Sequence, residues 1–398
     1  MDRAVKGFQT KSILFFTIAL MLCLGVASFA QSGRKPQGQQ GQQGQQGQQP
    51  GEKPVIKIET REVVIPLSAY DADGNYVDDL TPRDVIVLEE EEPRIVTSLR
   101  REPANIVLVL DLCNDIGTFK NGPSEYLHSS EEGPKRDKDM PVWVKPHEIV
   151  ARPTPREFAD NFVSRLSPND HISIIQYSDR VQLIQDWTNN REQALSSLRS
   201  KYRIGLKARY HDALMLATEK LRERVAGRRI IVLVSDGLDS ASRVSLSQAL
   251  TAIKRAQATV FVIGWAKALR EEIGLTLAMM QSQGMPGVEI LGSRRKRIAE
   301  LSNYLRSLDG AAVELRDLAE SSGGEIWLPP THSELSSSPK TLVKEIGAQY
   351  SLAFLTERKP LPGLAGLDDT RSIQVFPARK GLSLHSRNNY YVGDDGRH

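Results

Sequence analysis

The stretch of sequence that decides the fold is IVLVLDLCNDIGTFK, residues 106–120. An apolar run begins at Ile106 and ends in Asp111, after which the chain turns polar. A short, continuous apolar run is typical of a strand that is buried on both faces. A buried strand that delivers a carboxylate to its carboxyl end is a common way to build a ligand site in an open α/β sheet. The stretch therefore predicts both a central strand and a candidate site at its end.

The same rhythm of strand and helix continues to about residue 330. Helical periodicity lies between the apolar runs, for example with Phe158, Phe162 and Leu166 on one face of a predicted helix. This alternation predicts an α/β fold with a doubly wound, mostly parallel sheet that helices cover on both sides. The further predicted strands are HISIIQYS (171–178), RRIIVLVSDG (228–237), ATVFVIG (258–264) and GGEIWLP (323–329).

The first 30 residues have the pattern of a secretory signal peptide. Three basic residues precede the apolar run Ile13–Val26, and the small residues Ser28 and Ala30, on either side of Phe29, supply a cleavage site. We therefore expect an exported protein, periplasmic or extracellular, without a transmembrane segment after cleavage. An uncleaved membrane anchor is the alternative, because the sequence alone does not show cleavage.

Charge and cysteine content narrow the possible partners. Removal of residues 1–30 takes the net charge from +3 to +1, which does not favour nucleic acid as a partner. One cysteine, Cys113, then remains in the chain, so the predicted export occurs without an internal disulfide.

The predicted domain organisation is a signal peptide (1–30), a Gly/Gln-rich disordered linker (31–53), a β-rich flank (54–103), the α/β domain (104–342) and a β-rich C-terminal flank (343–393). Two insertions are expected within the α/β domain, near 119–152 and 266–309. The second contains a Met-rich stretch and a basic helix over 293–309, separate from a further helix near 313–320. The Glu89–Glu92 run is expected to form a solvated turn between two strands of the first flank.

The motifs IVLVLD, HISIIQYS, YHDAL and IIVLVSDGLDS resemble, in order and spacing, those of a von Willebrand factor A domain. The flanks, VVIPLSAYDADGNYVDDLTPRDVIVLEE and QYSLAFLTERK with RSIQVFPARKGLSLHSRNNYYV, look like the exported VWFA-related family common in Acidobacteria. This resemblance implies that the α/β domain is inserted into a small β-rich domain, so that residues 55–103 and 347–393 pack together.

The resemblance also implies a site. Such domains often hold a divalent ion on an Asp-x-Ser-x-Ser loop, a threonine and a further aspartate. Here Asp111 and Asp236 match the two aspartates, Cys113 and Asp115 stand at the serine positions, and Ala208 stands at the threonine. A thiol is a poor ligand for magnesium and an alanine offers none. Asp111, Asp115 and Asp236 remain as candidate ligands of one divalent cation (Mg, Mn or Ca), in a degenerate form of the adhesion site. The alternative is that these aspartates only cap turns.

No enzymatic signature is evident. The sequence has no His-Glu-x-x-His, Gly-x-Ser-x-Gly or Gly-Lys-Ser/Thr motif. A thiol-dependent function at Cys113, with His211 as its partner, is the weaker alternative.

The sequence therefore predicts a non-enzymatic binding protein. Its partner would be another protein or an envelope component, met at the top of the sheet by loop positions Asp111, Cys113, Asp115, Ala208, Asp236 and Asp239. A metal-independent scaffold that binds through the β-rich flanks or the insertions is the second hypothesis.

Overall fold

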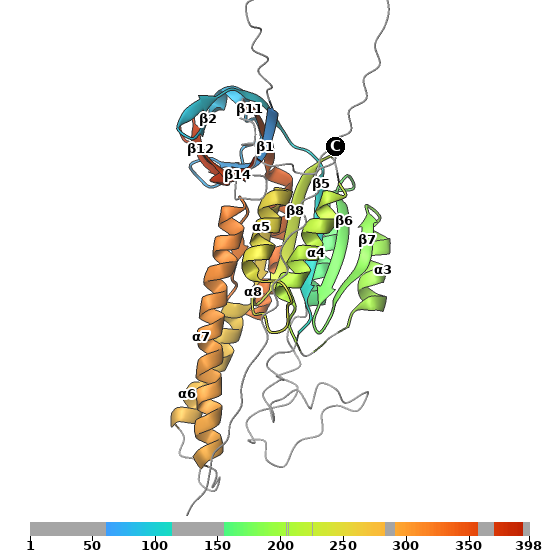
Figure 1. Ribbon diagram of the computed structural model, residues 1–398, viewed down its shortest axis with the longest axis vertical. Helices are drawn as coiled ribbons and strands as arrows, with labels where there is room; N and C mark the ends of the chain where they lie inside the picture. Colours follow the sequence, from blue (N-terminus) through green and yellow to red (C-terminus); the bar gives the residue numbers. More distant parts are fainter. Residues whose placement is uncertain are drawn as a thin grey trace, which may run out of the picture. The chain divides into compact units, whose positions relative to one another are not determined.

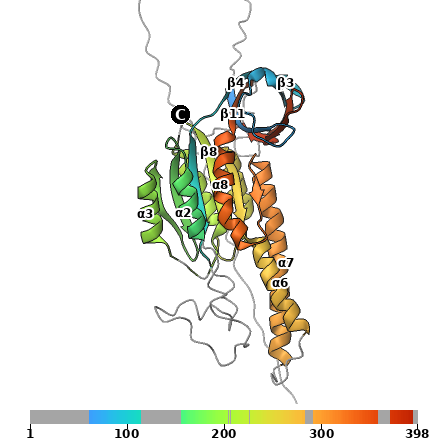
Figure 2. The same cartoon turned by 180° about the vertical axis from the view of Figure 1, so that it is seen from behind.

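The computed structural model describes residues 61–113, 155–203, 205, 207–224, 226–282, 291–356 and 370–392 (Figures 1 and 2). All of them belong to one unit of the chain, Lys57–His398. The predicted signal peptide and linker, the 119–152 insertion and Asp115 lie outside the described residues. Among the described helices, none is long and apolar enough to cross a membrane.

Six strands form the sheet of the α/β region: β5 (Ala104–Asp111), β6 (His171–Tyr177), β7 (Val181–Thr188), β8 (Arg228–Ser235), β9 (Thr259–Gly264) and β10 (Ile326–Trp327). Their order is β10-β9-β8-β5-β6-β7. All neighbours are parallel except β7, which runs antiparallel to β6 at the edge of the sheet. The predicted mostly parallel sheet is confirmed. The edge strand β7 was not predicted, because polar residues interrupt its apolar pattern.

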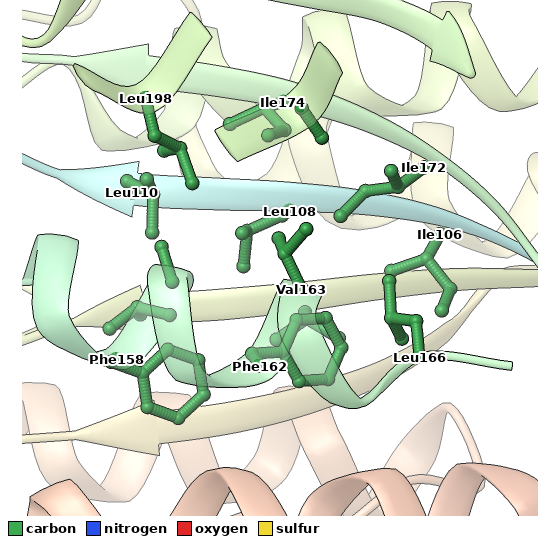
Figure 3. Close-up of a cluster of buried hydrophobic side chains, with 14 of the residues drawn as sticks. Ile106, Leu108, Leu110, Phe158, Phe162, Val163, Leu166, Ile172, Ile174 and Leu198 are labelled. Carbon is green, nitrogen blue, oxygen red and sulfur yellow. The ribbon is translucent and has the colours of Figure 1, made fainter. Parts of the chain in front are cut away.

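The central strand β5 is buried along its whole length. Its even-numbered residues Ile106, Leu108 and Leu110 pack into one hydrophobic cluster (Figure 3), and Val107 and Val109 pack into a second cluster on the opposite face. Successive side chains of a strand point to opposite faces. The run is therefore continuously apolar because both faces of the sheet are covered.

Helices cover both faces, as predicted. On one face lie α2 (Pro155–Arg165), α3 (Arg191–Lys201) and α8 (His332–Ala348); on the other lie α4 (Tyr210–Arg222), α5 (Leu246–Ala256) and α7 (Leu291–Ser321). Figure 1 shows the sheet from the side of α4 and α5, and Figure 2 shows the opposite side, where α2 and α8 lie in front. The fold is thus a doubly wound α/β fold.

The second predicted insertion forms a helical pair. α6 (Ala266–Ser282) and α7 pack through Leu269, Ile273, Leu301 and Leu308. The prediction of two helices, 293–309 and 313–320, was wrong: α7 is one helix of 31 residues that runs through Gly310. A glycine costs a helix about 1 kcal/mol relative to alanine, which packing of this length offsets.

The flanks form two four-stranded sheets. The first has the order β13-β1-β11-β4 and the second β14-β12-β2-β3. Strand β1 pairs with β11 from Arg61↔Thr356 to Leu67↔Tyr350, so the segments before and after the α/β region share one antiparallel sheet. This confirms the predicted packing of the two flanks. The bounds are β1 (Arg61–Tyr70), β2 (Val85–Glu89), β3 (Glu92–Arg94), β4 (Val96–Arg100), β11 (Tyr350–Thr356), β12 (Thr370–Pro377), β13 (Ser383–Ser386) and β14 (Asn389–Tyr391).

Glu89 corrects the prediction of a solvated turn. Glu90 and Glu91, with φ of 49° and 68°, make the turn between β2 and β3, but Glu89 is fully buried. Its carboxylate accepts hydrogen bonds from Arg94 Nε at 2.6 Å, Thr356 Oγ1 at 3.0 Å and the Tyr390 hydroxyl. These donors outweigh the effect of burial and hold the pKa of Glu89 below its usual value. The residues that make Glu89 a buried ion come from β3, β11 and β14, so its role depends on tertiary contacts.

We predict that Glu89→Ala lowers the free energy of unfolding by about 3–5 kcal/mol, because it leaves Arg94 and two hydroxyls without their buried acceptor. Glu91→Ala removes the same groups from an exposed position and should change stability little. Because the folded-state pKa of Glu89 is lowered, its contribution should be present above about pH 4.5 and lost as the pH falls. Chemical denaturation of both variants at two pH values measures this; equal losses would contradict a structural role for Glu89.

Candidate functional site

Four loops meet at the carboxyl edge of the sheet. They are residues 111–113 after β5, 178–180 after β6, 202–212 around the start of α4, and 236–244 after β8; we call them together the carboxyl-edge face. Register brings the first, second and fourth side by side, since Asp111 pairs with Tyr177 and Leu110 with Val234. The third is joined to the first by a bridge between Gly205 and Cys113. This edge is where ligand sites form in open α/β sheets.

Asp111 is buried at the centre of this face. Its Oδ1 accepts from the Cys113 backbone N at 3.0 Å and from the Cys113 thiol, and its Oδ2 accepts from Ser235 Oγ at 3.3 Å. The Tyr177 hydroxyl lies 2.7 Å from Ser235 Oγ. Burial raises the pKa of Asp111 above its usual value, against the effect of these donors. All of these donors are neutral, so the strand end holds its carboxylate by hydrogen bonds rather than by a charge partner.

Cys113 is half-buried beside the third loop. Gly205 N donates to Leu112 O at 3.0 Å, next to the Cys113–Gly205 bridge. A Cβ on Gly205 would lie 2.5 Å from Asp179 Oδ2 and 2.6 Å from Ser178 Oγ. The first three loops therefore touch at a point where only glycine fits.

Ala208, at the position of the family's threonine, is fully buried in the apolar cluster under α4. Its backbone N donates to Ser240 Oγ at 2.9 Å, and its carbonyl accepts from Ser240 N at 3.1 Å and Ala241 N at 2.9 Å. The position thus joins the third loop to the fourth through the backbone, and its side chain is part of the core.

Asp236 is buried, and its Oδ1 accepts from Leu238 N at 2.9 Å. Gly237 follows with φ +82°, and a Cβ there would lie 2.8 Å from the Leu315 side chain. The fourth loop therefore packs closely against α7, and Gly237 adopts a backbone conformation that favours glycine.

Two aspartates fasten α4 to the fourth loop. Asp239 Oδ1 accepts from Tyr210 N at 2.8 Å, at the first turn of α4, and its other oxygen accepts from Ser242 N at 3.2 Å. In the opposite direction, Asp212 Oδ1 accepts from Arg243 N at 2.9 Å. These backbone bonds, together with Arg209, lower the pKa of Asp212. Asp239, predicted as a partner-binding position, is thus also a cap of α4.

The described donors do not fit a hard divalent cation. Asp111 and Asp236 offer oxygens that already accept N–H, O–H or S–H groups, Cys113 offers sulfur, and Ala208 offers no ligand. Among the described residues there is no group of three or more His, Cys, Asp or Glu side chains that could hold a metal ion. Asp115, the third carboxylate of the predicted trio, lies outside them. The predicted cation is thus not supported by the described residues and awaits a binding measurement.

The described contacts do not support the alternative hypothesis of a thiol-dependent function, because they do not pair Cys113 with His211. The Cys113 thiol donates to Asp111. His211 instead lies on the α4 side of the face, with Nδ1 3.3 Å from Val244 O and 3.8 Å from Asp239 Oδ2.

Sequence reasoning missed several residues of this face. Tyr177 and Ser235 are the last residues of β6 and β8, where they follow apolar runs. Nothing in the local sequence indicates that their hydroxyls interact with Asp111. Asp212 and Ser240 lie in loops whose contact only the fold creates. The HDAL motif was a usable signal for Asp212, because an aspartate in the first turn of a helix is a common loop anchor.

Comparison with known proteins finds one matching domain profile. Residues 153–285 match the family profile of the von Willebrand factor type A domain. No curated protein matches the chain.

Solved structures align over more of the chain. A von Willebrand factor type A protein from Catenulispora acidiphila aligns at 9% identity over 84% of this chain and 73% of its own, with a TM-score of 0.38. An aerotolerance-related membrane protein from Bacteroides fragilis aligns at 16% over 61% and 98%, with a TM-score of 0.34. The PilB minor pilin from Streptococcus sanguinis aligns at 13% over 63% and 62%, with a TM-score of 0.34. At these values the likeness carries no inference about function.

We predict that thermal unfolding is unchanged by millimolar magnesium, manganese or calcium relative to chelator. A site with a Kd of ~10 μM at ~1 mM ion would add about 2.7 kcal/mol to the free energy of unfolding. A rise of that size in the wild type that is absent in Asp111→Ala would contradict this prediction and would establish an ion site.

Proposed function

Because the chain carries a von Willebrand factor type A domain, we propose that it is an exported, non-catalytic binding protein whose carboxyl-edge face docks an acidic segment of a partner protein or envelope component without a bound cation. Domains of this family mediate protein–protein interactions. Export is supported by the signal-peptide pattern of residues 1–30.

One observation supports the choice of face and partner: charges of opposite sign are separated there. Arg180, Arg203, Lys207 and Arg243 are exposed, and we call these four residues the basic rim. The carboxylates of Asp111, Asp212, Asp236 and Asp239 instead accept hydrogen bonds within the face. Asp179 and Asp239 are also exposed, so the four cations of the rim outnumber the exposed carboxylates of the face by two.

The chemistry of this separation favours an acidic partner. A carboxylate that accepts backbone N–H groups is held inside the fold and contributes less to the outward field than an exposed side chain does. The exposed guanidinium groups remain able to pair with carboxylates, often through two parallel hydrogen bonds. Such a rim increases the association rate of an oppositely charged surface and disfavours a like-charged one.

The hydrogen bonds that join the loops of the face favour binding. Its loops are joined by the Ala208–Ser240 backbone bonds, by Asp239 on α4 and by Asp212 on the fourth loop. A surface that is ordered before binding loses less conformational entropy when a partner docks. The proposed role therefore needs no movement of these loops.

A second candidate surface lies on the β-rich flank. Ile86 of β2 and Phe376 of β12 are direct neighbours in register and are 46% and 44% exposed. An exposed apolar pair of this kind favours the scaffold hypothesis, in which the flank binds the partner.

Site-specific cross-linking distinguishes the two surfaces. A benzoylphenylalanine placed in the native host at Lys207 should give a discrete partner adduct, whereas one at Phe376 should not. An adduct from Phe376 alone would favour the flank and overturn the proposal.

With the captured partner purified, we predict that the double variant Lys207→Glu with Arg243→Glu weakens binding roughly tenfold or more, mainly through the association rate. Raising the salt concentration should weaken wild-type binding and leave the variant nearly unaffected. Arg222→Glu changes an exposed cation at the end of α4, at the opposite edge of the sheet, and serves as the matched control. Equal effects of the variant and the control would rule out the basic rim as the docking surface.

A further inference from the structure

We propose that a single proton on Glu325 closes the joint between the β-rich flank and the α/β domain: Glu325 donates it in a hydrogen bond to the Tyr70 hydroxyl, and Tyr70 donates its own hydrogen to Glu345. The joint therefore responds to pH. This inference concerns a different part of the molecule from the carboxyl-edge face and does not depend on the proposed function.

The two glutamates meet one hydroxyl. Tyr70 OH, at the end of β1, lies 2.8 Å from Glu325 Oε1 and 3.1 Å from both carboxylate oxygens of Glu345. Glu325 directly precedes β10, and Glu345 lies in the last part of α8. Glu345 belongs to the α/β domain as Glu325 does, because α8 packs on the sheet and continues to Ala348, past the predicted domain boundary at 342. The hydroxyl belongs to the flank, so the contact spans the joint.

Glu345 has further hydroxyl donors from the flank. Ser68 Oγ donates to Oε1 at 2.8 Å, and the Tyr76 hydroxyl donates to Oε2. The side chain of Glu345 is almost fully buried. In the proposed arrangement Glu345 carries the negative charge, and the hydroxyls of Ser68, Tyr70 and Tyr76 surround it.

A count of protons shows why one more is needed. The Tyr70 hydroxyl has one hydrogen and stands between two carboxyl groups. If both glutamates are ionised, this hydrogen serves one of them, and the other carboxylate faces an oxygen lone pair. If Glu325 is protonated, it donates to Tyr70 oxygen and Tyr70 donates to Glu345, so every group in the chain has its partner. Two carboxylates that share a site disfavour double ionisation for the same reason.

The surrounding charges do not remove the need for the proton. His385 of β13 lies near Glu325, and its Nε2 is 3.3 Å from Gly324 O. Lys344 of α8 stands 4.8 Å from the centre of the Tyr76 ring. Burial first, and then the charge of Glu345, raise the pKa of Glu325 above its usual value, and the charge of His385 opposes this only in part. Burial and the same carboxylates raise the pKa of Tyr70 and Tyr76, so both hydroxyls keep their hydrogens.

The sign of the pH dependence follows from the direction of this shift. A carboxyl group with a raised folded-state pKa stabilises the fold fully below its ordinary pKa, 4.5 for a glutamate, and loses that contribution as the pH rises through the raised value. The joint should therefore be tightest in acid. Glu89 in the flank has the opposite sign, since its pKa is lowered.

The test uses the full chain and the variant Glu325→Gln, whose amide can donate to Tyr70 at every pH. We expect the thermal midpoint of the wild type to fall, relative to that of the variant, as the pH rises above about 4.5, by roughly 2–4 °C in total. Infrared spectra from about pH 4 to about pH 9 should show a protonated-carboxyl band that outlasts those of ordinary glutamates and is missing in the variant. Parallel midpoint profiles with an unchanged band would overturn the proposal.

Two further variants keep the result decisive. Glu345→Gln removes the neighbouring charge, so the Glu325 band should disappear at lower pH than in the wild type; an unchanged titration would also count against a shared proton. This variant replaces Glu325→Gln if the latter does not fold. Glu219→Gln changes an exposed glutamate of α4 and should match the wild type in both measurements. Because the buried Asp111 also has a raised pKa, its band is identified separately with Asp111→Asn.

Discussion

The burial of β5 on both of its faces is the constraint on which the rest of the structure depends. A strand with Leu108 packed on one face and Val107 on the other needs helices on both sides of the sheet. Helices reach these faces on crossover connections, so β10, β9, β8, β5 and β6 run parallel, and β7 at the edge of the sheet is antiparallel. Parallel strands end at one edge, and this is why Asp111, Ser178 and Asp236, far apart in the sequence, belong to one face.

Three buried or partly buried carboxylates have different surroundings in this chain. Glu89 has a guanidinium and two hydroxyls as donors, which keep it ionised. Asp111 has only neutral donors at the end of a buried strand, and its pKa is raised. Glu325 has a second carboxylate as a neighbour and one shared hydroxyl. The donors around a carboxylate decide its charge more than the degree of burial does, because burial raises the pKa of all three.

The positions that the resemblance assigns to a metal site make other contacts here. Cys113 and Ala208 stand where the resemblance implies a serine and a threonine. The Cys113 thiol donates to Asp111, and the Ala208 side chain packs in the core under α4. The aspartates that would face an ion or a partner accept hydrogen bonds from the loops instead. The face thus keeps a fixed geometry and presents cationic side chains outward.

The sequence by itself determined the elements that depend on local patterns. Continuous apolar runs predicted β5, β6, β8, β9 and β10, and the spacing of Phe158, Phe162 and Leu166 predicted α2, because periodicity and burial are properties of neighbouring residues. The ends of these strands placed Asp111 and Asp236 at one site. Tertiary structure alone decided which side chains meet across hundreds of residues. The pairing of β1 with β11, the burial of Glu89 among Arg94, Thr356 and Tyr390, and the contact of Tyr70 with Glu345 required the fold. A glutamate in a polar run has the same local pattern whether water or a guanidinium and two hydroxyls surround it, so its environment becomes defined only when distant strands close over it.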